Sequence, residues 1–205
     1  MSRLAGSPFR PDDPILHEED LSAVAEIIPP SYRLRGMLFS RLTRDLPPAT
    51  WEGLAPSLRE PPEGGRYVAF QSYPFADYHE LLLACARVRF PALGRCEAVR
   101  RLARDDFTTF AESMIGRVSL RLIAGPRSAL LRMPGIYEAM AAGEWQVKAT
   151  ELNAETVRIE FENFFGVWPY QLGQLEEVVK RLGGRPEIDA HRPHARALTL
   201  DVRHG

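Results

Sequence analysis

The side chains of this sequence that could do chemistry are histidines, cysteines and neighbouring pairs of acids. A metal or catalytic site needs several such groups to converge on one point. His191 and His194 flank Pro193 in an expected hairpin turn, with no third metal ligand at a suitable spacing. His79 lies on a helical segment among apolar residues, which favours a partly buried or surface histidine over a ligand. We therefore expect no metal site.

The adjacent acids do not form ready acid–base couples, because neighbouring residues of a helix point in different directions. We expect Asp105 or Asp106 to cap a helix that starts near Phe107, and Glu176-Glu177 to lie on a solvated face. The sequence has no glycine-rich phosphate loop followed by Lys-Ser/Thr, and no Gly-x-Ser-x-Gly elbow. We predict that the protein is not an enzyme in its own right.

The charges of the chain are balanced, with Lys+Arg 26, Asp+Glu 27 and a net charge of -1 over 205 residues. This balance provides no overall field to attract nucleic acid or an anionic membrane. The arginine-rich stretch 87–104 contains one acid, Glu97, so an anion or RNA site is one interpretation. A solvated helical face is favoured, because no aromatic residues alternate with the arginines. We expect neither a nucleic-acid nor a membrane partner.

Two features of the sequence favour the cytoplasm. The first residues, MSRLAGSPFRPDDP, lack the apolar run of a signal peptide, and no stretch approaches the ~20 apolar residues of a membrane span. Cys85 and Cys96 fall in apolar helical sequence, where they are expected to be reduced core residues.

The polar, proline-containing residues 1–14 are expected to be a flexible arm, and hydrophobic periodicity predicts one α+β domain at 15–205. Apolar residues recur at helical spacing up to about residue 142. Expected helices cover about 21–28, 32–46, 51–58, 74–90, 99–102, 107–122 and 127–141.

The period then changes from 3.6 to 2, which predicts a small antiparallel sheet at about 143–205. Strands 145–150 and 157–162 form a hairpin, a helix starts near Pro169 and ends at Gly183-Gly184, and two short strands follow. The expected order of this part is ββαββ.

Several segments resemble an uncharacterised paralogous family found chiefly in myxobacteria. They are RLRGMLFSRLTRDL, AFQSYPFADYHELLLACARVRFP, FTTFAESMIGRVSLRLI and PRSALLRMPGIYEAM, of which FQSYPFADY and AESMIGR are the most specific. The order of elements is also similar, more distantly, to the haem-nitric-oxide/oxygen-binding fold and its vinyl-reductase-type (4VR) relatives. The resemblance implies a helical part followed by strands with one helix between them.

The resemblance breaks down at the residues that would hold haem. The helix expected to carry a proximal histidine reads Gly125-Pro126-Arg127-Ser128-Ala129-Leu130-Leu131-Arg132. The strand expected to carry a Tyr-x-Ser-x-Arg clamp for the haem propionates reads Phe161-Glu162-Asn163-Phe164-Phe165. We therefore expect no haem and no other cofactor, and a colourless protein.

Without haem, the space between the helical part and the sheet must hold side chains or another ligand. The candidates to surround it are Phe39, Phe110, Met114, Phe161, Phe164, Phe165, Trp168 and Tyr170. Three interpretations stay open: an aromatic core, a pocket for an apolar small molecule, and an exposed patch that docks a protein.

The function favoured by these observations is a non-catalytic, cytoplasmic sensory or regulatory binding module, with an apolar small molecule as its ligand. The alternative is a structural interaction domain, a homodimer, whose aromatic core is closed. The favoured function rests on analogy with a sensor fold and on the absence of recognisable catalytic chemistry.

Overall fold

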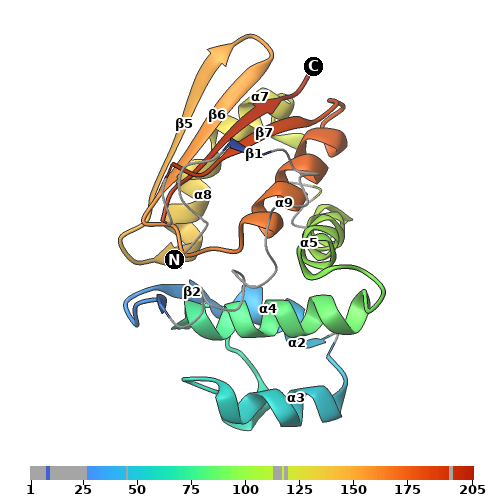
Figure 1. The fold of residues 1–205 in the computed structure, drawn as a ribbon, viewed down its shortest axis with the longest axis vertical. Coiled ribbons are helices and arrows are strands. Elements are labelled where there is room, and N and C mark those ends of the chain that lie inside the picture. The colour runs from blue at the N-terminus through green and yellow to red at the C-terminus, as the bar shows by residue number, and fades with distance from the viewer. Residues whose placement is uncertain (1–7, 10–26, 45, 113–116, 118–119, 194–195) are drawn as a thin grey trace.

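The computed structural model describes residues 8–9, 27–44, 46–112, 117, 120–193 and 196–205. Figure 1 shows the larger of two sheets, with α7, α8 and α9, in one half of the molecule, and α2, α3 and α4 in the other half. The helices are α2 (Gly36–Arg44), α3 (Pro48–Leu54), α4 (Phe75–Arg89), α5 (Arg95–Glu112), α7 (Pro126–Leu131), α8 (Met133–Met140) and α9 (Trp168–Arg181). The strands are β1 (Pro8–Phe9), β2 (Arg33–Arg35), β3 (Ser72–Pro74), β4 (Ala141–Ala142), β5 (Gln146–Asn153), β6 (Thr156–Glu162), β7 (Glu187–His191) and β8 (Leu198–Arg203).

The larger sheet has five strands in the order β1-β7-β8-β6-β5, and every neighbouring pair is antiparallel. Alternation along β6 buries Val157, Ile159 and Phe161, while Arg158 and Glu160 stay partly exposed. Along the chain this part runs β5, β6, α9, β7, β8. The prediction of a mixed fold with an antiparallel sheet is confirmed.

The sheet also includes a strand from the predicted arm. Pro8 pairs with His191 and Phe9 with Ala190, so β1 forms one edge beside β7. The rest of the predicted arm, and most of the helix expected at about 21–28, lie outside the described residues.

A second sheet, of three short strands, lies in the part expected to be helical. Its order is β3-β2-β4, so the helix expected over 32–46 is wrong at its start. Leu34 fits the leucine stripe of α2, but it pairs with Tyr73 of β3. The helix begins only at Gly36, where a side chain would meet the Val68 carbonyl oxygen at 2.1 Å. Strand pairing therefore overrides the local helical pattern.

Two other helix boundaries differ from those expected. Residues 95–112 form one helix, α5, instead of separate helices that meet near Asp105. The helix expected at 127–141 is divided at Arg132 into α7 and α8. Pro134 explains the division, because proline has no N–H to continue the hydrogen bonds of α7.

The buried residues form two clusters. The first joins α2, α4 and α5 with Phe165, Val167 and Tyr170. The second joins β6, β7, β8, α9 and Leu130 of α7. Trp145 is partly buried and packs against both clusters. The prediction of a single domain at 15–205 therefore remains a prediction, which a cooperativity experiment can test.

Helices α5 and α9 pack closely. Gly173 permits the approach, because a side chain there would lie 2.1 Å from the Arg100 carbonyl oxygen. Beside it, Glu176 accepts hydrogen bonds from Arg100 Nε at 3.0 Å and Arg104 Nε at 2.7 Å. The Glu176 side chain is only 8% exposed and that of Arg100 11%. The expectation of a solvated face is therefore wrong for these residues, which face each other across the helix pair.

Candidate functional site

The structure divides the aromatic residues predicted to surround a pocket between the two cores. Phe39, Phe165 and Tyr170 belong to the first cluster, and Phe161, Phe164 and Trp168 to the second. Phe110 is half-buried on α5, with its ring 6.0 Å from that of Phe107. Met114 lies outside the described residues.

A pocket of about 140 Å³ lies where the two halves of the molecule meet. Its walls come from α2, α4, α8, α9 and the segment around Trp145. Of the eight predicted residues, Tyr170 alone is among those that line it. Phe75, Tyr78, Tyr137 and Trp145 line it instead. Tyr78 lies on the apolar face of the helix expected at 74–90, but periodicity alone cannot separate a pocket wall from a core.

A chain of buried polar groups borders the pocket. The Tyr78 hydroxyl donates to the Tyr170 hydroxyl at 3.4 Å, and the Tyr170 hydroxyl donates to Asp106 Oδ2 at 3.0 Å. Arg41 Nη2 hydrogen-bonds the Asp106 carbonyl oxygen and lies 3.7 Å from Asp106 Oδ1. Asp106 is thus a buried acceptor inside α5, and its prediction as a helix cap is wrong. Burial raises the pKa of Tyr78 and Tyr170, so both phenols stay protonated at neutral pH.

Another hydrogen bond crosses the pocket between α8 and α9. The Tyr137 hydroxyl donates to Gln171 Oε1. Burial raises the pKa of Tyr137, which keeps its hydroxyl a donor. Because Gln171 is itself buried, this bond satisfies the side-chain oxygen and leaves the amide nitrogen without a partner among the described residues.

A larger groove, of about 570 Å³, lies between α8 and the start of β5. It shares Tyr137, Ala141 and Trp145 with the pocket, so the two hollows have a common wall. Glu138 and Lys148 are among its other residues and are exposed. The groove is lined by polar and apolar groups in similar measure, in contrast to the largely apolar pocket.

The residues around the pocket do not fit a haem. Cofactor and drug-sized sites usually measure ~300–1,000 Å³, well above the size of this pocket. Helix α7, expected to carry the axial histidine, instead packs Leu130 into the second core with no exposed surface. Cysteine can also bind haem iron, but neither Cys85 nor Cys96 lines the pocket, and Cys85 hydrogen-bonds the Leu42 carbonyl oxygen at 3.0 Å.

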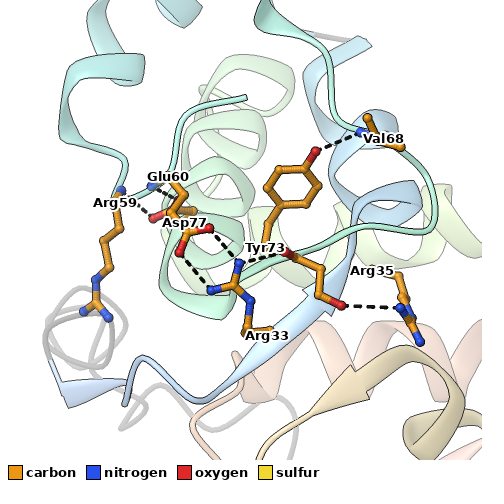
Figure 2. Close-up of polar contacts among 8 residues, drawn as sticks. Arg33, Arg35, Arg59, Glu60, Val68, Tyr73 and Asp77 are labelled. Atoms are coloured by element: carbon orange, nitrogen blue, oxygen red, sulfur yellow. Dashed lines mark hydrogen bonds and ion pairs between the residues drawn. The ribbon is translucent and has the colours of Figure 1, made fainter. Parts of the chain in front are cut away.

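A second polar cluster fastens the segment after α3 to α4 (Figure 2). The buried Asp77 carboxylate accepts the backbone N–H groups of Arg59 and Glu60 at 2.8 and 2.9 Å. Arg33 then donates to both carboxylate oxygens of Glu60, at 2.8 and 2.6 Å. Burial raises the pKa of Asp77, and the two backbone bonds oppose that effect. Each group in the cluster is paired within it, so we assign it a structural role.

His79 is the other buried titratable group on α4. It is fully buried, and neither ring nitrogen has a hydrogen-bond partner among the described residues. Among the described residues, His79 is therefore not paired with an acid, and a catalytic role would require such a pair. Groups of three or more potential metal ligands are also absent from the part of the chain that the structure describes.

Replacing His79 by leucine is expected to flatten the pH dependence of stability. Burial lowers the pKa of His79 to about 4, against ~6.5 in an unfolded chain. The neutral ring stabilises the fold fully above pH ~6.5, and this contribution is lost as the pH falls toward 4. The loss is up to ~1.4 kcal/mol per pH unit, or ~3 kcal/mol in total.

Urea unfolding at several pH values between 7 and 4 measures this effect. The wild-type free energy of unfolding should fall more steeply than that of the His79→Leu variant. Parallel curves for the two proteins would show that another group controls the acid sensitivity.

Solved structures of H-NOX proteins share this fold. The Fe(II) unliganded H-NOX protein from K. algicida has 13% identity and a TM-score of 0.64, over 84% of this chain and 97% of that one. The S. oneidensis H-NOX protein in its Fe(II)NO ligation state has 11% identity and a TM-score of 0.62, over 84% and 99%. A point mutant of the T. tengcongensis H-NOX protein has 11% identity and a TM-score of 0.56, over 89% and 94%. At these identities the likeness establishes the fold alone.

None of the described helices is long and apolar enough to cross a membrane.

Sequence comparison identifies the family of the chain. No curated protein matches this chain. Residues 28–204, which hold both sheets except β1 and all the walls of the pocket, match the family described as "Protein of unknown function (DUF2378)". The chain is thus a member of the DUF2378 family with an H-NOX-like fold.

Proposed function

We propose that this protein is a sensory binding module whose ligand is a small, largely apolar molecule held in the pocket between α2, α4, α8 and α9. The observation that carries the proposal is the size of the pocket, about 140 Å³. An engineered apolar cavity of ~150 Å³ is known to bind benzene. A ligand about the size of a single ring therefore suits the pocket, and a haem does not.

The position of the pocket supports a sensory role. It is lined by α2 and α4 on one side and by α8 and α9 on the other, so a ligand would contact both halves of the molecule. A ligand that binds one arrangement of the halves more tightly shifts the population toward it. We propose a cytoplasmic location, which suits two cysteines, Cys85 and Cys96, that are not joined in a disulfide.

Titration with benzyl alcohol, a neutral single-ring probe, tests the proposal by ligand-observed NMR. The matched variants are Leu38→Trp, in the wall of the pocket, and Met37→Trp, on the exposed side of the same helix. We expect the wild type and Met37→Trp to bind the probe, and Leu38→Trp to lose binding because the indole fills the pocket. Absence of wild-type binding both to this probe and to benzoate, a charged single-ring molecule of similar size, would refute the proposal, as would equal binding to all three proteins.

The second candidate function is a structural interaction domain, a homodimer with a closed core. It is favoured by the burial of Phe39, Phe161 and Phe164 in the cores rather than around the pocket. The side chain of Ile136 on α8, which lines the pocket but is 48% exposed, offers an apolar contact. Light scattering after size exclusion distinguishes the two functions. A wild-type dimer that Ile136→Glu dissociates, together with no probe binding to the wild type, supports the interaction domain.

A further inference from the structure

The polar side chains around the pocket include one charged group, and this group bears on the charge that a ligand can carry. Arg41 is the single charged side chain that lines the pocket among the described residues, and no carboxylate lines it there. Its Nη2 contacts Asp106, whereas Nε and Nη1 have no partner among the described residues. The guanidinium therefore retains hydrogen-bond donors for a ligand.

The tyrosine hydroxyls that border the pocket already donate elsewhere. Tyr78 donates to Tyr170, Tyr170 donates to Asp106, and Tyr137 donates to Gln171. Because each phenol has a single hydrogen, none of these bonds can be redirected to a ligand without breaking the network.

Apart from Gln174 and the lone pairs of the tyrosine oxygens, the polar groups that remain in the wall are donors. Gln171 uses its side-chain oxygen for Tyr137, which leaves the Nε2 hydrogens. Arg41 adds N–H groups that carry a positive charge, in a planar arrangement that matches a carboxylate. Gln174, also in the wall, can donate or accept. A neutral alcohol would use one of these donors, whereas the two oxygens of a carboxylate could use several.

From this set of donors we infer that the ligand is a small monocarboxylate, with a single ring or a short branched chain as its apolar part. The carboxylate binds to Arg41 and the Gln171 amide, and the apolar part packs against Phe75, Leu82 and Met133. Asp106 does not line the pocket, and its oxygens already accept from Tyr170 and contact Arg41. One arginine can serve both carboxylates, because its planar head presents five N–H donors. The inference rests on the proposed function, since both need the pocket to admit a ligand.

The test compares benzoate with benzyl alcohol, a neutral molecule of similar size, on the full chain at neutral pH. Calorimetric titration of the wild type should show that benzoate binds at least about tenfold more tightly. Arg41→Gln should lose that preference, with a similar affinity for the two probes. Arg44→Gln, which changes an exposed arginine of the same helix outside the pocket wall, should retain it.

The wild-type result separates the two ideas without relying on any variant. Benzyl alcohol binding as tightly as benzoate, or more tightly, would overturn the carboxylate inference and leave the binding module intact. Binding of neither probe would overturn both. If Arg41→Gln is unfolded by circular dichroism, Arg41→Lys replaces it, since lysine keeps the charge but loses the planar pair of donors. Arg41→Lys should then bind benzoate more weakly than the wild type, and unchanged binding would count against the proposed contact.

Discussion

Glu176→Ala is expected to lower the free energy of unfolding by about 3–5 kcal/mol. The substitution removes the carboxylate that pairs with Arg100 and Arg104 between α5 and α9, where the Arg100 side chain is only 11% exposed. A buried guanidinium without its partner costs more than the ion pair itself contributes, because water cannot replace the lost carboxylate. Glu97, 3.9 Å from Arg100, is half-exposed and compensates in part.

Urea unfolding followed by tryptophan fluorescence measures this effect. Lys180→Ala, on an exposed position of the same helix, is the matched control and should stay within about 0.5 kcal/mol of the wild type. A Glu176→Ala protein as stable as this control would mean that the ion pair is solvated in solution.

Phe39→Ala is expected to cost about 3–5 kcal/mol, the range for a large aromatic removed from a core. Phe39 has no exposed surface, and its ring lies 4.6 Å from that of Tyr67 and 5.3 Å from that of Tyr78. Rings in such contact lose both buried area and aromatic pairing when one is removed.

The same variant tests whether residues 15–205 form a single domain. Leu200→Ala removes a side chain with no exposed surface from the second core, at an expected cost of about 2–5 kcal/mol. Because Trp145 packs against both cores, we expect each substitution to shift one common transition in far-ultraviolet circular dichroism. Two transitions, with Phe39→Ala moving one and Leu200→Ala the other, would establish two units instead.

Local patterns predicted the second half of the chain well. The hairpin of β5 and β6 and the helix α9 follow from alternation and from the 3.6-residue period, which neighbouring residues determine. The small sheet could not be predicted in this way. Leu34 satisfies the helical stripe, and its pairing with Tyr73 depends on a segment almost forty residues away.

The pocket was harder to predict than the fold. Its walls combine residues of α2, such as Arg41, with residues near position 170. The spacing of residues in the sequence carries no information on how close these two segments lie. Asp106 illustrates the difficulty, because it has the sequence context of a helix cap and the structure makes it a buried acceptor for Tyr170. The sequence alone shows that residues 125–132 lack the histidine that a haem would need. Residue types can be read directly from a sequence, whereas contacts between distant segments cannot.

The composition of the first core has a consequence for the order of events during synthesis. Most of that core comes from residues 28–103, which leave the ribosome early, but Phe165, Val167 and Tyr170 complete it. The nascent helical part therefore exposes apolar surface until the start of α9 has emerged, and such surface is what chaperones bind. The larger sheet closes later still, because β1 at residues 8–9 pairs with β7 at 187–191. This edge of the sheet forms only after residue 191 has been made, and pairing between segments so far apart in the sequence is slow.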